Sequence, residues 1–209
     1  LSIRRQRQMC IRDRSLPVRT GKARVIGIEP ASLVTKSLVR EVKTDDAGCF
    51  QSALNPGLTK IAVIERHKRT GKLGIGILEG YGLTGGAIAT TISHDSHNIV
   101  VAGDNDPDML LAVRELADMG GGIVSVHGGA IRRLPLPIAG LMTSADPQEV
   151  NAVLHDMLVA ARAELGIPED VEPFMTLSFM ALPVIPELKL TARGLFNVNT
   201  FSFVGVEAD

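Results

Sequence analysis

The sequence predicts an α+β fold: a mixed sheet with two main helices packed on it, preceded by a short β remnant. Three observations indicate this class. From residue 23 onward, apolar runs of strand length alternate with turns rich in glycine, proline and aspartate. Two longer segments instead place apolar residues at helical spacing behind capping residues. A length of 209 residues, 45% hydrophobic and 22% charged, suits a globular chain with a sizeable core.

The expected strands are short and apolar. Residues 24–28 and 38–42 form the β remnant, which ends in a turn over residues 45–48 and is followed by a linker over residues 48–56. The strands expected beyond the linker are 60–66, 72–79, 87–93, 98–103, the hairpin pair 123–126 and 130–134, and a last strand within 196–206.

The first expected helix has Asp106 as its N-cap and Pro107 in the first helical position, and it ends at Gly120. The residues expected on its inner face are Leu110, Val113 and Ala117.

The second expected helix begins with Asp146 as N-cap, Pro147 at the first position and Glu149 in the first turn, and it continues to Gly166. The apolar residues that keep the helical period are Val150, Val153, Leu154, Met157, Leu158, Ala161 and Leu165.

Composition disfavours several classes of protein. No apolar run approaches the roughly 18–20 residues that a membrane span needs, so we expect no membrane partner. Residues 1–14 carry five Arg and one Asp, which leaves 17 basic and 22 acidic residues in the rest of the chain. That negative body and the scarcity of aromatic residues disfavour a nucleic-acid partner. The two cysteines, Cys10 and Cys49, lack metal-site or CxxC spacing, which favours a reducing, cytoplasmic setting.

Residues 1–14 fit no element of the expected fold. They are too polar for a secretory signal and lack the pattern of a transit peptide. They resemble the translated read-through of a sequencing adapter, so we expect a non-native segment here. A disordered basic arm is the alternative.

Residues 80–98 concentrate the side chains that carry chemistry. A glycine-rich turn over residues 80–86 lies close in sequence to two imidazoles, a carboxylate, a hydroxyl and an amide. Imidazoles and carboxylates carry protons and metals in many active sites. The residues of this polar group are His94, Asp95, Ser96, His97 and Asn98. The stretch therefore indicates a site without specifying which kind.

Several interpretations of this stretch stay open. Residues 80–85 match the dinucleotide fingerprint, with Asp104 at suitable spacing, but the next residues favour a strand over the helix that such a site needs. A tight turn between strands is the plainer interpretation. His94 and His97 could chelate a metal, although no third ligand is fixed by spacing, and a His-Asp-Ser triad is disfavoured between sequence neighbours. Asp95 and Asn98 could instead cap backbone amides.

Residues 173–186 are apolar and interrupted by prolines. We expect the segment to be too broken for a helix, and to form either core or an interface with another domain.

Four segments together resemble the C-terminal domain of bacterial adenine deaminases, a family of the amidohydrolase superfamily. They occur in the family's order and are residues 80–98, 98–103, 134–142 and 173–189. The resemblance implies an enzyme that converts adenine and water to hypoxanthine and ammonia on a metal-bearing (β/α)8 barrel. It also implies a divalent metal pair, manganese or iron.

The resemblance further implies how this chain relates to such an enzyme. The chain has no His-x-His pair and no run of eight βα units, so we expect no metal ligands in it and a fragment that is inactive alone. Residues 15–57 would be the remnant of a small β-domain with its linker, and residues 58–209 the C-terminal domain. The implied partners are adenine, the missing barrel domain and further copies in a homo-oligomer.

By the same resemblance, the loop over residues 80–98 would face the barrel mouth. The residues implied as auxiliary catalytic groups are His94, Asp95 and His97, and those implied to bind substrate are Gly82, Ser96 and Asn98. Two other functions stay open: a stand-alone purine-binding or regulatory module, and a nicotinamide enzyme built on residues 80–85.

Overall fold

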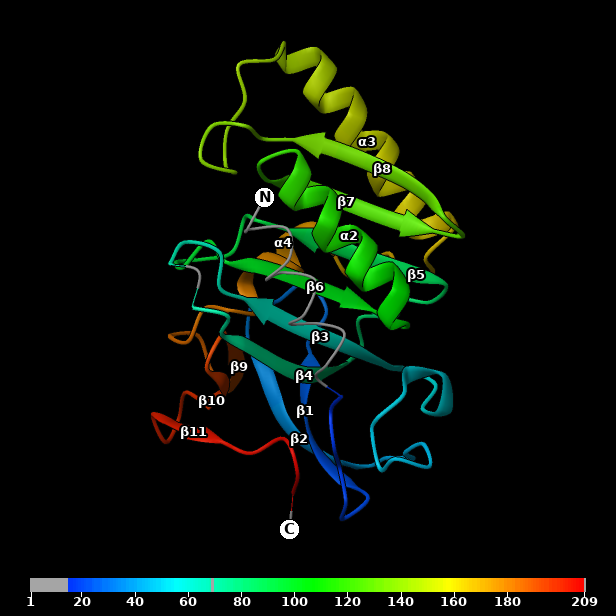
Figure 1. Ribbon diagram of the computed structural model, residues 1–209, viewed down its shortest axis with the longest axis vertical. Coiled ribbons are helices and arrows are strands. Elements are labelled where there is room, and N and C mark those ends of the chain that lie inside the picture. The colour runs from blue at the N-terminus through cyan, green and yellow to red at the C-terminus, as the bar shows by residue number, and fades with distance from the viewer. Residues whose placement is uncertain (1–14, 69, 209) are drawn as a thin grey trace.

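A computed structural model describes residues 15–68 and 70–208. Its centre is an eight-stranded mixed sheet in the order β2-β1-β4-β3-β6-β5-β7-β8, and a three-stranded sheet, β11-β10-β9, lies beside β4 (Figure 1). This arrangement confirms the expected α+β class. The strands of the large sheet are β1 (Lys22–Ile28), β2 (Thr35–Glu41), β3 (Leu58–Ile64), β4 (Leu73–Glu79), β5 (Gly86–Thr90), β6 (Ile99–Gly103), β7 (Gly122–His127) and β8 (Ala130–Pro135). The remaining elements are β9 (Leu188–Thr191), β10 (Gly194–Asn197), β11 (Ser202–Val204), the 3-10 turn η1 (Ser52–Leu54) and the helices α2 (Asp106–Asp118), α3 (Pro147–Ala163) and α4 (Pro173–Phe179).

The β1–β2 hairpin extends the same sheet as the later strands. Strand β1 pairs with β4 in parallel, with Ile26 opposite Leu78, whereas the other pairs between the described strands are antiparallel. The residues expected to form a β remnant are therefore hydrogen-bonded into the main sheet. Their origin in a separate small domain stays a prediction.

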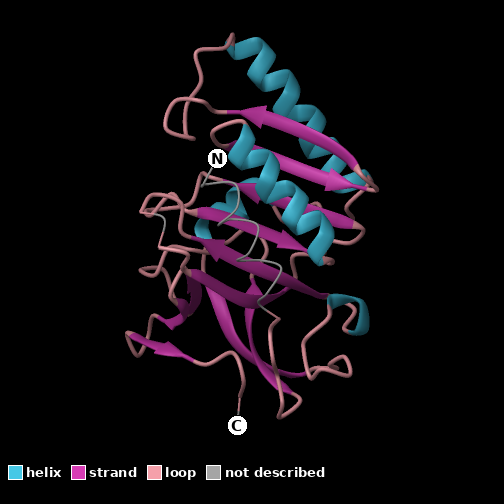
Figure 2. Ribbon diagram, viewed as in Figure 1, coloured by secondary structure: helices cyan, strands magenta, loops and turns pink. Residues whose placement is uncertain are grey.

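The central strands are buried on both faces, so the molecule has three layers (Figure 2). Along β3, Ile61 and Val63 face a core that includes α3 and α4, and the alternating residues Ala62 and Ile64 face a core that includes α2. Strands covered on both sides are apolar at every position, as in a sheet between helices. This explains why residues 99–103 form an unbroken apolar run.

Helix α2 begins one residue earlier than expected, because Asn105, and not Asp106, is its N-cap. Asn105 has an extended backbone and its Oδ1 accepts a hydrogen bond from the Asp108 amide at 2.9 Å. The expected inner face is also wrong in two of three positions, since Leu110 and Ala117 are only half-buried. The residues that α2 buries against the sheet are Met109, Ala112, Val113 and Leu116.

Helix α3 begins as expected. The Asp146 side chain accepts a hydrogen bond from the Gln148 amide at 2.8 Å, and Pro147 occupies the first turn. Only the second half of its apolar stripe is well buried, because the first half extends past the sheet beside β8 (Figure 1). Val153 is accordingly 37% exposed.

Two expectations about the C-terminal third are wrong. Residues 173–179 do form a helix, α4, because Pro173 lies in the first turn, where its missing N–H costs nothing, and Glu172 caps the Met175 amide. The tail is not one strand but the hairpin β10–β11, since Asn197 accepts a hydrogen bond from the Thr200 amide at 3.1 Å and Phe201 has a left-handed backbone (φ 50°).

None of the helices in the described residues has the length and apolar character that crossing a membrane requires.

Candidate functional site

The polar group of the sequence lies in the turn between β5 and β6, residues 91–98, which we call the polar turn. Its start is fixed by Thr91, whose Oγ1 accepts a hydrogen bond from the Gly122 amide (2.8 Å) and donates one to the Gly140 carbonyl (2.6 Å). Further along, the His94 amide donates to the Ser178 carbonyl at 3.0 Å, which ties the turn to α4. The polar turn is thus held by three separate segments.

Arg66 holds the other side of the polar turn. Its guanidinium donates to the His97 carbonyl and to the Ala139 carbonyl, each at 2.6 Å. The ring of His67 forms a hydrogen bond with the Ser96 carbonyl at 2.8 Å. Arg66 is 31 residues from His97 in the chain, so no local pattern in the sequence could have identified it.

The two imidazoles of the polar turn lie close together. The ring centroids of His94 and His97 are 5.8 Å apart, and His94 also packs on Phe179 at 4.6 Å. Burial, followed by the nearby His94 and Arg66, lowers the pKa of His97, so this imidazole is neutral at pH 7. Its Nδ1 is buried and has no hydrogen-bond partner among the described residues. A neutral imidazole with a free ring nitrogen can accept or donate one proton or hydrogen bond.

Asp95 and Ser96 differ from the two histidines in being exposed. A carboxylate and a hydroxyl at the surface can form hydrogen bonds with a ligand or with another polypeptide. Asn98, in contrast, is buried (8% exposed), and its Oδ1 accepts a hydrogen bond from the Arg66 amide at 3.4 Å. The structure thus brings five of the six predicted site residues into one turn.

Gly82 lies apart from the others, at the opposite end of β5. The five residues of β5 separate the two ends by about 13 Å, at ~3.3 Å per residue. Gly82 packs against Pro168, where an added Cβ would lie 2.5 Å from the proline ring. The structure therefore does not bring Gly82 together with Ser96 and Asn98, and each residue's role in binding substrate stays a prediction.

The glycine turn at that end also lacks the geometry of a dinucleotide site. It leads into strand β5 rather than a helix, as its β-branched continuation predicted. Its amides are instead satisfied within the protein, because Asp104 accepts hydrogen bonds from the amides of Gly85 (2.5 Å) and Gly86 (3.0 Å).

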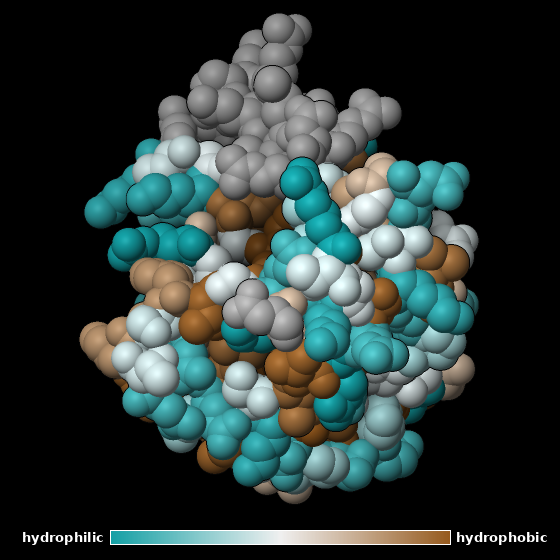
Figure 3. Space-filling model, turned by 90° about the horizontal axis from the view of Figure 1, so that it is seen from below, coloured by the Kyte–Doolittle hydropathy of each residue, from teal (hydrophilic) through white to brown (hydrophobic). Residues whose placement is uncertain are grey.

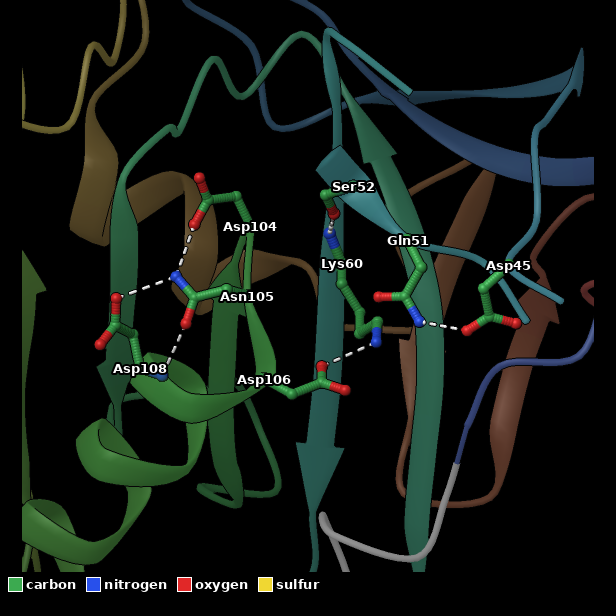
Figure 4. Close-up of polar contacts among 8 residues, drawn as sticks. All are labelled: Asp45, Gln51, Ser52, Lys60, Asp104, Asn105, Asp106 and Asp108. Carbon is green, nitrogen blue, oxygen red and sulfur yellow. Dashed lines mark hydrogen bonds and ion pairs between the residues drawn. The ribbon is translucent and has the colours of Figure 1, made fainter. Parts of the chain in front are cut away.

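A second polar cluster lies next to this glycine turn, around the start of α2 (Figure 4). Buried Lys60 donates to Asp106 at 2.7 Å, and the Asn105 amide nitrogen donates to Asp104 and Asp108, each at 2.9 Å. Each of these contacts joins two side chains of the protein. We interpret the cluster as structural, because its groups satisfy one another and the helix N-terminus.

The chemistry of the polar turn does not extend to a metal site. The described residues contain no group of three or more His, Cys, Asp or Glu side chains that could hold a metal ion. The residues present therefore do not fit the metal pair that the resemblance implies, and the interpretation of His94 and His97 as a self-contained metal site is not supported.

An open groove of about 760 Å³ adjoins the polar turn. Asp95, Ser96 and Asn98 line it together with Glu65 and Arg193, which makes one side polar. Its apolar lining includes Leu182, Val184, Ala192, Phe196, Phe201 and Phe203. No pattern in the sequence indicates this groove, because its lining comes from five segments that only the fold brings together. A hollow of about 790 Å³ beside the β1–β2 hairpin contains none of the predicted site residues.

Comparison with known proteins identifies the family. The model of the adenine deaminase C-terminal domain family matches residues 32–202. The chain belongs to this family. Among curated relatives, the adenine deaminase of Nitratidesulfovibrio vulgaris strain Hildenborough is 60% identical over 192 residues, which cover 91% of this chain and 33% of the relative. Adenine deaminase 2 of Carboxydothermus hydrogenoformans is 48% identical with the same coverage, and the adenine deaminase of Clostridium acetobutylicum is 45% identical over 90% of this chain and 33% of the relative.

The length of these relatives matters for the site. This chain spans about a third of the length of the curated relatives it matches. In those relatives, the polar turn and its groove therefore belong to a protein about three times as long as this chain.

Proposed function

We propose that this chain functions as the C-terminal part of an adenine deaminase, which hydrolyses adenine to hypoxanthine and ammonia. The observation that carries the proposal is the 60% identity, over 91% of this chain, to a protein named adenine deaminase. We further propose a cytoplasmic, homo-oligomeric enzyme of the amidohydrolase superfamily. Its metal pair, manganese or iron, would be held by a barrel domain outside this chain, where it would activate the attacking water.

The part assigned to this chain is to complete the site rather than to perform the hydrolysis. Exposed Asp95 and Ser96 can reach a ligand or a neighbouring domain, and neutral His97, whose Nδ1 is buried, lies beside them in the turn. Such groups can bind the polar edge of a purine and help exclude water when the site closes. Arg66 and Thr91 would act as positioning residues, because they fix the backbone of the polar turn.

A chimera tests this proposal directly. The N. vulgaris enzyme would carry this chain's 192-residue matching segment in place of its own, and adenine hydrolysis would be measured by ammonia release. We expect a chimera with kcat/KM within about tenfold of the parent, and no hydrolysis by the 209-residue chain alone. A folded chimera that does not hydrolyse adenine would refute the proposal.

A stand-alone purine-binding module is the second candidate, favoured by the phenylalanine-lined groove beside a carboxylate and a hydroxyl. Calorimetric titration of the chain with adenine distinguishes the two. The module requires saturable binding that Asp95→Ala weakens, whereas the C-terminal part of an enzyme does not need to bind adenine alone.

A further inference from the structure

Half of the chain's phenylalanines lie together on one side of the small sheet. The sequence has six, and Phe196, Phe201 and Phe203 all line the groove. Phe196 lies directly opposite Phe203 in the β10–β11 pair, and its ring contacts both others edge-on, with centroids 5.2 Å apart. We call these three residues and Val184 the aromatic face.

The aromatic face is exposed although the small sheet already has a buried side. Leu190 and Leu195 point into the main core, as expected for a sheet that covers β4. On the other side, Phe201 is 77% exposed, Val184 65% and Phe203 44%, whereas Phe196 between the other two rings is buried (9%). In the view from below, apolar side chains reach the surface at the left edge of the molecule, the side on which β11 lies in Figure 1 (Figure 3). Large clustered apolar side chains at a surface mark interaction sites.

The backbone at Phe201 adds an independent observation. Its φ of 50° places a bulky residue in the left-handed region, which glycine or asparagine adopts at a lower cost. The β10–β11 turn therefore does not account for a phenylalanine at this position. Strained backbone that presents an exposed side chain is typical of functional positions.

We propose that the aromatic face docks against the part of the adenine deaminase polypeptide that precedes this domain. The proposal rests on the proposed function, since that function supplies the partner. In relatives that are up to 60% identical, the matched segment is 33% of the chain, so the remaining two-thirds are available to cover this face.

The size of the groove favours a covalently linked partner over a second copy. Fifteen described residues line it, whereas a stable interface between separate proteins uses about 20–30 residues a side. A domain in the same polypeptide docks at a high effective concentration, so a smaller face is sufficient. The composition of the lining fits as well, because it combines apolar side chains with charged residues of both signs, Glu65, Lys72, Asp95 and Arg193.

Docking of this kind would also explain the position of the polar turn. Asp95 and Ser96 line the same groove as the aromatic face, so a partner seated there lies next to both. The contact that covers Phe201 would then bring the exposed carboxylate and hydroxyl to the domain boundary.

Thiol labelling tests which molecule covers the aromatic face. Phe201→Cys would be compared in the 209-residue chain and in the N. vulgaris chimera, in a Cys10→Ser background where Cys49 is buried. We expect maleimide to label Phe201→Cys roughly tenfold more slowly in the chimera than in the chain alone. The matched control is Val159→Cys on α3, which replaces a side chain that is 52% exposed and should label equally in both proteins.

Each other outcome overturns the proposal. Equal labelling of Phe201→Cys in both proteins would mean that the preceding part leaves the face uncovered. Protection in the chain alone that grows with its concentration would assign the face to a second copy, and protection by adenine would assign it to the ligand. As a second measurement, Phe201→Ser should speed proteolysis at the junction of the chimera more than Val159→Ser does. Labelling does not depend on turnover, so an inactive but protected chimera would refute the proposed function and not the docking.

Discussion

The two ends of strand β5 are built from one stretch of sequence, yet they differ in what surrounds their polar groups. At the closed end, which comprises the glycine turn and the start of α2, Asp104 satisfies the amides of Gly85 and Gly86, although the buried Nδ1 of His127 beside Gly85 lacks a partner among the described residues. At the open end, which comprises the polar turn and the groove, buried Ser93 Oγ and His97 Nδ1 lack partners among the described residues, and Asp95 is exposed. Exposed polar groups beside exposed apolar side chains indicate a site, whereas backbone amides satisfied by the protein's own carboxylate indicate structure.

The largest expected effect lies at the closed end. In Gly86→Ala the added Cβ would lie 2.0 Å from the Val126 carbonyl oxygen, which belongs to the paired strand and cannot move away. We expect the free energy of unfolding to fall by about 3 kcal/mol or more. The control is Gly128→Ala, at a positive φ of 54° with no atom within 4 Å, which should cost about 1 kcal/mol. Urea unfolding measures both, and equal losses would contradict a tightly packed closed end.

The next effect concerns Lys189, on the half of the small sheet that residues 33–35 cover. It is fully buried (0% exposed), its Nζ donates to the Leu33 carbonyl at 2.9 Å, and burial lowers its pKa from 10.5 to about 8. The folded state therefore disfavours the charged form, so stability is lowest below pH 8 and rises as the pH increases from about 8 to 10.5. We expect a rise of up to about 3 kcal/mol relative to Lys189→Met, which lacks this titration.

Urea unfolding at pH 7, 8, 9 and 10 checks the prediction for Lys189. The variant Lys68→Met, which replaces an exposed lysine, serves as the control and should parallel the parent chain. Parallel curves for Lys189→Met as well would show that Lys189 does not titrate in this window.

A smaller loss is expected for Arg66→Ala at the open end. The substitution removes the guanidinium from the His97 and Ala139 carbonyls, to which it donates at 2.6 Å. We expect the free energy of unfolding to fall by about 2 kcal/mol, because the two carbonyls lose a charged hydrogen-bond donor. Arg133→Ala breaks a partly exposed ion pair with Glu115 and should cost less than Arg66→Ala, because surface ion pairs contribute little to stability. A loss at Arg66 no larger than at Arg133 would mean that the polar turn is fixed without this clamp.

The smallest effect is the acid response of Glu65, at the rim of the groove. Burial acts to raise its pKa, but hydrogen bonds from the amides of His67, Lys68 and Thr70 and from the Thr70 hydroxyl prevail, and they lower the pKa from 4.5 to about 2. The stabilisation is present above pH 4.5 and is lost as the pH falls from 4.5 to 2. Glu65→Gln should reduce the loss in the free energy of unfolding between pH 4.5 and 2 by about 1 kcal/mol at most. Glu149→Gln, at an exposed position, should leave that loss unchanged. Thermal melts at pH 2–5 measure the difference.

Features set by neighbouring residues could be predicted from the sequence. The start of α3 follows from Asp146 and Pro147, and the β7–β8 hairpin from the two glycines after His127, because caps and tight turns are local. Helix α4 is not expected from the sequence because the prolines of residues 173–186 suggest a broken segment, although Pro173 lies where a helix tolerates proline and the other prolines follow the helix.

The open end could be predicted only in part, because sequence patterns report features set by neighbouring residues. The polar turn is contiguous in sequence and was identified, whereas Arg66 and the aromatic face reach it through tertiary packing from distant segments. Separation of Gly82 from Ser96 likewise depends on β5 being a strand that lies between them. Periodicity predicts that an element forms, but it does not say which ends of the elements meet.

The most direct test of the account is steady-state kinetics of adenine hydrolysis in the N. vulgaris chimera that carries Asp95→Ala and His97→Ala. We predict a fall in kcat/KM of at least about tenfold, with unfolding unchanged, while the control pair His155→Ala and Asp156→Ala, at exposed positions of α3, leaves kcat/KM unchanged. Unchanged kcat and KM in the Asp95 and His97 variant would show that the open end is structural, as the closed end is.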